Sequence, residues 1–390
     1  MLILQSLYNG ARRAISPLSF GEGSGVRSLR RIILTVTNDL TYDQRMQRIC
    51  TSLSAAGYEV ELVGRELATS KPLDKFPFSQ VRLKCWFNKG KLFYLEYNFR
   101  LFFYLLFHRA NIICAIDLDT IVAGYYAARL NGAKIVYDAH EFFPEVPEVV
   151  RRPAIQKVWR WVERTYTPKV DLVYTVTQSI SDIFEKEYKR PVYTIRNLPI
   201  LQELSAPPQP ERSYLLYQGA LNEGRGLEHL ISAMTDIDID LYLVGEGDIT
   251  TQLKEQTQQL GLECKVKFLG FKKPDELRQI TAQAYIGLNL LEQKGLSYYY
   301  SLANKFSDYI HAGIPQICIN FPEYKRLNDQ YHVGLLIDDL DQDTIKAAIN
   351  TLLADKKKYG EFKENCLVCR RELNWQNEEK KLISLYERLS

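Results

Sequence analysis

The sequence lacks the long apolar runs, the paired cysteines and the strong net charge that mark several classes of protein. No stretch of 18 apolar residues occurs, so no bilayer-spanning helix is expected. The seven cysteines are scattered without a disulfide framework, which favours a reducing, cytoplasmic compartment. Cys366 and Cys369 form a lone Cys-x2-Cys pair, and we expect two thiols on a helix rather than a zinc site. A net charge of +3 is too small for a protein that mainly coats nucleic acid.

The charge is distributed unevenly along the chain. Residues 1–200 carry 28 Lys and Arg against 19 Asp and Glu, whereas residues 201–390 carry 22 against 28. A basic first half predicts an anionic partner such as a membrane surface, a phosphorylated lipid or nucleic acid. The acidic second half argues against nucleic acid, so none is expected.

Short β-branched runs alternate with helical stretches in two separate regions, which predicts an α/β fold with two Rossmann-like parallel sheets. We expect a poorly ordered extension over 1–29, an N-terminal domain over 30–204 and a Pro-rich linker over 205–213. A C-terminal domain is expected over 214–365, followed by a C-terminal helix over 366–390 that crosses back to the first domain. Two such sheets would face each other across a cleft lined by the carboxyl ends of their strands.

The second region contains two candidate phosphate sites. Gly219 and Gly226 flank a loop between a strand and a helix, with Arg225 at its mouth, although an ordinary turn with an exposed arginine is an equal alternative. Further on, Ser301 is expected to cap a helix that starts near Ala303, leaving free N–H groups for an anion beside Lys305. Asp308 lies one turn later on the same face, where a carboxylate suits ribose hydroxyls; the alternative is a capped amphipathic helix with a surface ion pair.

These segments, taken in order, resemble a retaining glycosyltransferase of family 4 with the GT-B fold, over residues 30–388. The resemblance is carried by five short motifs: Thr35-Val36-Thr37-Asn38-Asp39 with Asp43-Gln44-Arg45, Tyr137-Asp138-Ala139-His140-Glu141, Tyr217-Gln218-Gly219 through Arg225-Gly226, Val244-Gly245-Glu246-Gly247, and Ser301 through Tyr309 followed by Ala312-Gly313-Ile314-Pro315. Each motif alone is weakly specific, whereas their order on two α/β units is specific.

The resemblance implies roles for individual residues. Arg225 and Lys305 would stabilise the donor diphosphate, and His140 would position the sugar or the acceptor; a buried structural histidine is the alternative. The implied donor-binding residues are Gly219, Gly226, Gly245, Phe268, Leu269, Gly270, Phe271, Ser301, Leu302, Ala303, Asn304 and Asp308. The implied acceptor-binding residues are Asn38, Asp39, Arg45, Asp138 and Glu141.

The chain departs from the family pattern at two positions. Tyr300 stands where the first glutamate of the E-x7-E pattern would fall, with Glu292 close by but out of register, and Ala220 replaces a frequent arginine. Lys305, characteristic of an Asn-Lys-x-x-Asp/Glu-Tyr helix subgroup, would supply the missing cation.

Two basic, aromatic segments bear on the acceptor. Residues 89–109 and 151–164 combine Lys and Arg with Phe, Tyr and Trp, and each is either a core helix with solvated charges or a helix lying in a membrane interface. With the basic first half, they favour contact with an anionic membrane at its inner face and a glycan or lipid-linked acceptor.

The expected activity is therefore transfer of a sugar from a nucleotide-diphosphate sugar with retention of configuration, in cell-surface polysaccharide or glycolipid synthesis. No metal or other cofactor is expected, since no paired-Asp motif is present and cations and helix N–H groups would hold the diphosphate. The alternatives are a nucleotide-sugar epimerase and a non-catalytic binding partner of the same fold. A phosphorylase would need a cofactor lysine and a longer chain, and a Rossmann dehydrogenase is disfavoured because no G-x-G-x-x-G follows the first strand.

Overall fold

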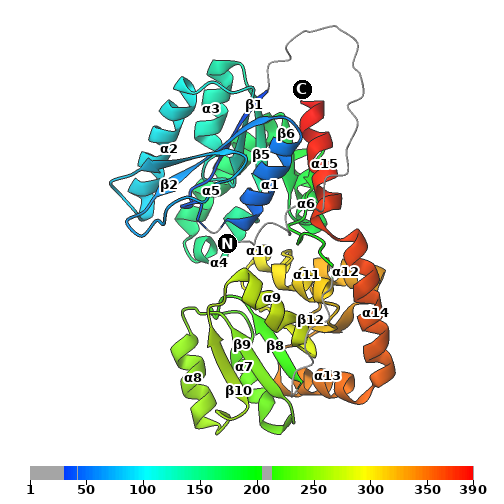
Figure 1. Cartoon of the computed structure of the whole chain (residues 1–390). Coiled ribbons are helices and arrows are strands. Elements are labelled where there is room, and N and C mark those ends of the chain that lie inside the picture. Colours follow the sequence, from blue (N-terminus) through cyan, green and yellow to red (C-terminus); the bar gives the residue numbers. More distant parts are fainter. Residues whose placement is uncertain (1–29, 42, 204–212, 390) are drawn as a thin grey trace, which may run out of the picture.

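The computed structural model describes residues 30–41, 43–203 and 213–389, which form two α/β domains stacked one above the other (Figure 1). The expected extension over 1–29 and all of the expected linker except Ser213 lie outside the described residues. Each domain is built on one parallel sheet, as the alternation of strands and helices predicted.

The N-terminal sheet has the order β3-β2-β1-β4-β5-β6-β7, and every strand pair is parallel. Its strands are β1 Arg31–Thr35, β2 Glu59–Glu66, β3 Ser79–Lys84, β4 Ile112–Ile116, β5 Lys134–Ala139, β6 Leu172–Thr175 and β7 Tyr193–Thr194. The central strand β4 is buried along its whole length, as expected for a strand covered on both faces. The edge strand β3 was not predicted, because its half-exposed residues carry no continuous apolar run.

Helices cover both faces of the N-terminal sheet. α2, α3, α5 and α6 bury their apolar sides on one face, and α1 packs on the other. The helices are α1 Gln44–Ala55, α2 Gly90–Phe107, α3 Ile121–Asn131, α4 Pro147–Val150, α5 Pro153–Tyr166 and α6 Gln178–Tyr188. Asp43 caps α1 by accepting from the N–H of Met46, and Thr177 caps α6 by accepting from the N–H of Ile180.

The C-terminal sheet has the order β10-β9-β8-β11-β12-β13 and is also parallel. Its strands are β8 Tyr214–Gln218, β9 Asp240–Val244, β10 Val266–Gly270, β11 Ile286–Asn289, β12 Gln316–Ile319 and β13 Gly334–Ile337. The helices are α7 Leu227–Ala233, α8 Thr250–Gln259, α9 Pro274–Gln283, α10 Leu296–Tyr299, α11 Asn304–Ala312, α12 Pro322–Tyr331, α13 Gln342–Ala354 and α14 Lys356–Glu372. The alternation of strands and helices in this region is the one that the sequence predicted.

The chain returns to the first domain at its end, but later than expected. α14 belongs to the C-terminal domain, where Cys366 and Cys369 are buried as ordinary core thiols. The helix stops at Glu372, and α15 (Trp375–Arg388) then packs into the N-terminal core through Trp375 and Tyr386. The crossing therefore falls at residues 373–374 rather than at 366, because the apolar face of α14 fits the second domain along its whole length.

The carboxyl ends of both sheets meet at the domain boundary. After β6, Thr177 donates a hydrogen bond through Oγ1 to the carbonyl oxygen of Tyr300 over 3.0 Å. After β7, the Asn197 amide donates to Oδ1 of Asn304 over 2.9 Å. The fully buried Glu323 of α12 accepts from the N–H and hydroxyl groups of Ser179 at 3.1 and 2.9 Å. The loops after the strands of one domain thus lie against those of the other.

Candidate functional site

Three glycines form a backbone surface at the carboxyl ends of β8, β9 and β10. Gly219 and Gly245 have φ values of +128° and +136°, a region that side chains rarely adopt. A Cβ at Gly245 would lie 2.0 Å from the carbonyl oxygen of Gly219, so no side chain fits there. The N–H of Gly245 bonds the carbonyl oxygen of Gly270 over 2.9 Å. The three strand ends are therefore tied together, and Gly219 is exposed there without a side chain.

Two cations converge beside this surface. Lys305 is buried, with its Nζ 3.4 Å from the centre of the Tyr217 ring, and a Cβ on Gly219 would lie 3.8 Å from that nitrogen. Arg225 is half-buried, its guanidinium 4.8 Å from the Tyr298 ring. Neither side chain has an ion-pair partner among the described residues. Burial, followed by the nearby Arg225 charge, lowers the Lys305 pKa well below its ordinary value, so an anion bound here would relieve unfavourable charge.

The helix N-terminus beside Lys305 differs from the prediction. α11 begins at Asn304 with Ala303 as its N-cap, and Ser301 does not cap it. The Ser301 hydroxyl instead donates to the carbonyl oxygen of Tyr298 over 2.8 Å, and the Tyr324 hydroxyl accepts the N–H of Ala303. Within the described chain, the N–H groups of Asn304 and Lys305 have no acceptor, because they belong to the first turn. Leu302 packs partly against the domain core.

Asp308 is held in a chain of side-chain hydrogen bonds that the sequence did not reveal. Its Oδ2 accepts from the Gln218 amide over 2.9 Å, and Oε1 of Gln218 accepts from the Thr281 hydroxyl over 2.6 Å. Burial raises the pKa of Asp308 to about 6, although the Gln218 hydrogen bond and the Arg48 charge act in the opposite direction. Among the described residues, no hydrogen bond reaches the second carboxylate oxygen, and ribose hydroxyls are donors of the right kind for it.

Arg48 of α1 reaches this site from the N-terminal domain. It hydrogen-bonds Asn197, whose amide in turn bonds Asn304 at the start of α11. Burial, followed by the Arg45 charge, lowers the pKa of Arg48 to about 10. The sequence indicated only that Arg48 lies one helical turn after Arg45, on the same side of α1. The packing of the two domains brings it near Asp308.

The expected base-binding loop is in part a strand. Phe268, Leu269 and Gly270 are the last residues of β10, and the side chains of Phe268 and Leu269 pack into core clusters on opposite faces of the sheet. Only the backbone of Gly270 and the exposed Phe271 stand at the strand end. Gly226 precedes α7 with φ +66°, where a Cβ would touch Leu290, so its role is in the turn.

The two departures from the family pattern have structural explanations. The Tyr300 ring packs at the N-terminal core, and its carbonyl oxygen accepts from Thr177, so this residue joins the domains. Glu292 forms an ion pair with Lys294 at 3.0 Å. The Ala220 carbonyl oxygen accepts from the Tyr217 hydroxyl, and Lys305 lies over the ring of that tyrosine.

Two of the acceptor candidates, Arg45 and Asp138, form a buried group with His140. Asp138 is fully buried between Arg45, whose Nη2 donates to Oδ1 over 3.1 Å, and His140, whose Nε2 lies 3.1 Å from Oδ2. Burial alone would lower the His140 pKa, but the Asp138 carboxylate, helped by Asp117, more than offsets it and raises the pKa. These contacts orient His140 at the end of β5 and favour the charged form of its ring.

Two further carboxyl groups beside His140 were missed by sequence analysis. Asp117 has φ +57°, and its Oδ1 accepts the N–H of His140 over 2.9 Å. Burial raises the pKa of Asp117 to about 7 and that of Asp119 to about 6. Oδ2 of Asp119 accepts from the Thr37 hydroxyl over 2.7 Å. Both follow β4, which is the neighbour of β5 in the sheet. Their position just after a predicted strand is the feature from which sequence analysis could have found them.

The remaining acceptor candidates are less closely connected. The Asn38 amide donates to Asp43, and the Asp39 carboxylate accepts from Thr41 and from the Ser70 hydroxyl. These bonds shape the loop after β1 and do not join the group around His140. Glu141 is exposed directly after His140.

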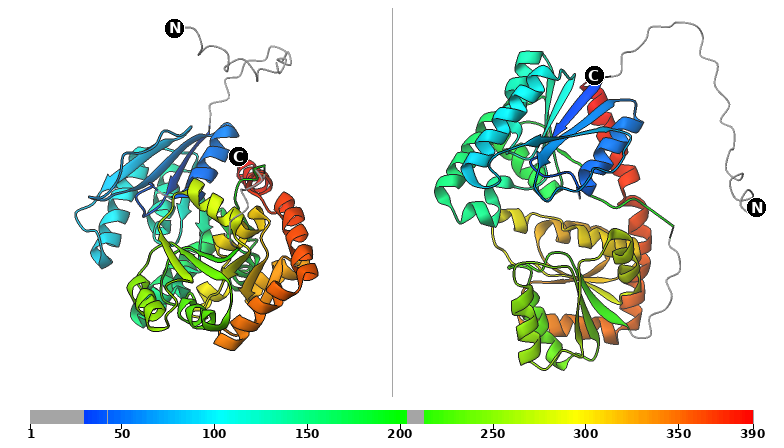
Figure 2. Two further views of the ribbon diagram at one scale, coloured as in Figure 1. Left: turned by 60° about the horizontal axis from the view of Figure 1, so that its bottom comes forward. Right: turned by 60° about the vertical axis from the view of Figure 1, so that its left-hand side comes forward.

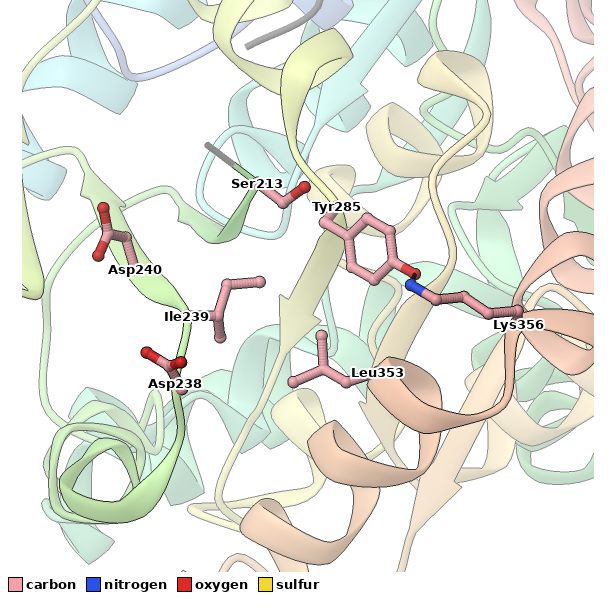
Figure 3. A pocket seen from close by; sticks show the side chains of 7 residues that line it. All are labelled: Ser213, Asp238, Ile239, Asp240, Tyr285, Leu353 and Lys356. Atoms are coloured by element: carbon pink, nitrogen blue, oxygen red, sulfur yellow. Dashed lines mark hydrogen bonds between the residues drawn. The ribbon is translucent and has the colours of Figure 1, made fainter. Parts of the chain in front are cut away.

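The structure also contains a hollow of about 270 Å³ away from these residues (Figure 3). It lies at the amino ends of β8, β9 and β11 and is lined by Ser213, Asp238, Ile239, Asp240, Tyr285, Leu353 and Lys356. Ligands of open α/β sheets bind at the carboxyl ends, so this hollow is not the candidate site. Among the described residues, no group of three or more His, Cys, Asp and Glu is placed to hold a metal ion.

Comparison with known families gives one match in each domain. The family Glycosyltransferase Family 4 matches residues 44–198, and the family Glycosyl transferases group 1 matches residues 203–366. Among curated proteins, an uncharacterized glycosyltransferase of Methanocaldococcus jannaschii is 35% identical over 80 residues, which is 20% of each chain. The chain thus spans a fifth of that relative's length.

Solved structures extend the likeness to nearly the whole chain. Sucrose-phosphate synthase from Thermosynechococcus elongatus has a TM-score of 0.78 at 18% identity, with 92% of this chain and 99% of the other covered. Anabaena HepE in complex with UDP has a TM-score of 0.73 at 15% identity, with coverage of 92% and 100%. At these identities the likeness establishes the shared two-domain fold.

Proposed function

Because the chain is a glycosyltransferase with the GT-B fold, we propose that it transfers a sugar from a nucleoside-diphosphate sugar to a glycan or lipid-linked acceptor, with retention of anomeric configuration. We place this reaction in the cytoplasm, in the synthesis of a cell-surface polysaccharide or glycolipid. The binding of UDP by HepE, which shares the fold, supports a uridine nucleotide as the first donor to test.

The observation that carries the proposal is the pair of cations at Gly219. Arg225 and Lys305 lie close together without a carboxylate partner in the described chain, beside bare backbone and the two free N–H groups of α11. A diphosphate leaving group gains negative charge as the glycosidic bond breaks, and preorganised positive groups stabilise that charge. These groups supply the positive charge from the protein itself, so the proposal requires no divalent metal or other cofactor.

The remaining side chains fit the same donor. Asp308, fixed by Gln218, would accept from the ribose hydroxyls, and Phe271 at the end of β10 would lie near the base. His140, oriented by Asp138 and Arg45, would hold the transferred sugar or the acceptor. In the proposed step the bond between the anomeric carbon and the diphosphate oxygen breaks. The acceptor hydroxyl oxygen bonds the anomeric carbon on the same face, and an oxygen of the leaving phosphate takes the hydroxyl proton.

Isothermal titration with UDP tests the donor site directly. Arg225→Ala removes one charge-assisted contact worth about 1.5–3 kcal/mol, so the Kd should rise by roughly 10- to 150-fold. Lys254→Ala, which removes an exposed lysine of α8, is the control and should leave the Kd unchanged. Equal affinity of the Arg225→Ala variant and the unsubstituted protein would remove the proposed donor site.

Incubation with nucleotide sugars alone separates the alternatives. A transferase releases little product without an acceptor, whereas an epimerase converts the free nucleotide sugar. Tyr300, in place of a carboxylate, and Ala220, in place of an arginine, are the residues that favour a non-catalytic protein. Such a protein would bind UDP and yet transfer no sugar from any nucleotide sugar to any glycan or lipid-linked acceptor.

A further inference from the structure

Helix α2 exposes a long apolar stripe on the outer side of the N-terminal domain. Phe93, Tyr97, Leu101 and Leu105 face the sheet and are buried. On the opposite side of the helix and in the turn before it, large apolar side chains are between 38% and 84% exposed. This α2 stripe consists of Trp86, Phe87, Leu92, Leu95, Phe99, Phe103 and Phe107. Contiguous patches of this kind on soluble proteins mark interaction surfaces.

The one carboxylate of the stripe, that of Glu96, is paired with groups of the protein itself. Glu96 lies within the stripe but accepts hydrogen bonds from the N–H groups of Trp86 and Phe87, at 3.0 and 2.9 Å, and from Nε of Arg100 at 2.8 Å. These bonds fix the turn against the helix. The Arg100 guanidinium then lies 4.6 Å from the Trp86 ring, which is the most exposed ring of the stripe. The turn thus presents a tryptophan and a cation together at the surface.

The surroundings of the stripe are basic. Between residues 84 and 109 the chain has five Lys and Arg and a single acidic residue, Glu96. A hollow of about 460 Å³ between β3 and α2 is lined by Phe99, Phe103 and Phe107 together with Lys84 and Arg100. An anionic lipid bilayer matches both properties, since rings insert at the headgroup level while cations meet lipid phosphates. A second copy of this chain would bring one basic rim against another.

We propose that the α2 stripe docks the protein on an anionic membrane surface, with α2 lying parallel to it. No helix of the described residues has the length and apolarity to cross a bilayer, whereas a helix that lies on the surface needs only one apolar face. α2 belongs to the N-terminal domain and lies on the side away from α15 (Figure 2). The inference concerns binding alone and is independent of the proposed sugar transfer.

Vesicle flotation of the full chain tests the docking. Vesicles with about 30 mol % phosphatidylglycerol in phosphatidylcholine should bind the protein at about 0.1 M NaCl and release most of it at about 0.5 M, because salt screens the charges. Phosphatidylcholine vesicles alone should bind several-fold less. The variant Leu95→Ser/Phe99→Ser removes two exposed apolar groups and should lower the partition coefficient by roughly tenfold or more.

Matched controls distinguish the stripe from general apolar or charge effects. Leu260→Ser/Val368→Ser alters two exposed apolar residues of the C-terminal domain and should bind as the unsubstituted protein does. Lys89→Glu/Lys91→Glu should weaken binding to anionic vesicles, and Lys254→Glu/Lys357→Glu should not. Vesicles of brominated lipid should quench the fluorescence of Trp86 when the unsubstituted protein binds. The variant Trp86→Tyr should lack this quenching.

Three results would overturn the docking. The first is no binding to anionic vesicles at low salt, and the second is equal binding by the Leu95→Ser/Phe99→Ser variant. The third is a concentration-dependent dimer in light scattering that this variant abolishes, without vesicle binding, which would assign the stripe to a second copy of the chain. Failure of UDP titration would bear on the donor site and leave this inference unaffected.

Discussion

Replacing Lys305 by methionine should weaken nucleotide binding and stabilise the fold at the same time. The ammonium is buried over the Tyr217 ring, near a second cation, and no carboxylate of the described chain pairs with it. The ring face offsets only part of the cost of burying the charge. Methionine has a similar length and no charge, so it fills the same space without that cost.

The magnitudes follow from the two interactions. Loss of one ammonium–phosphate contact costs about 1.5–3 kcal/mol, and the Kd for UDP should rise by roughly 10- to 150-fold. Removal of an unpaired buried charge should raise the free energy of unfolding by about 1–2 kcal/mol. Isothermal titration measures the first quantity and urea unfolding the second.

The pH dependence of stability provides an independent check on Lys305. Because its pKa in the folded protein is lowered, the unfolded chain binds a proton that the folded chain does not, between the lowered pKa and 10.5. Stability from this group therefore rises with pH across that window. In the Lys305→Met variant the rise should disappear. An unchanged Kd, or a lower stability of the variant at neutral pH, would refute the reasoning.

Three other substitutions test the remaining parts of the site and the domain boundary. Asp308→Asn should weaken UDP-glucose binding about tenfold. Because burial raises the pKa of Asp308 to about 6, the stability that this carboxyl contributes is lost as pH rises through 6. The variant should lack that loss and unfold at a higher urea concentration at pH 7.5, and equal pH profiles of the two proteins would contradict this. Glu323→Gln weakens the hydrogen bonds between the domains and should cost about 1–3 kcal/mol in thermal unfolding, with the exposed Glu364→Gln as control. Gly245→Ala forces a methyl group against the Gly219 carbonyl and should lower both stability and UDP affinity, whereas Gly360→Ala in α14, with open space around it, should be neutral or stabilising; equal effects of the two would sink the argument.

Much of the fold could be predicted from local sequence patterns. The apolar runs of β8 to β13 and the glycines at their ends could be identified because strand burial and positive φ leave marks within a few residues. The edge strand β3 and the break at residues 373–374 could not, since the first has half-exposed residues and the second depends on which domain each helix face fits. The Ser301 cap was wrong because a serine hydroxyl can either accept from a helix N–H or donate to a carbonyl oxygen, and here it donates to that of Tyr298 in the preceding turn.

Local patterns in the chain are enough to predict the α/β alternation, the glycine loops and the types of residue that the proposed diphosphate site would use. Which of these residues meet depends on the tertiary fold. Lys305 lies beside Arg225 and Gly219 only because β8 and β11 are neighbours in the sheet, and Arg48 approaches Asp308 only because the two domains are joined through Asn197 and Glu323. Spacing along a chain fixes the face on which a side chain lies, whereas proximity between distant segments depends on sheet order and domain packing, which no local pattern encodes.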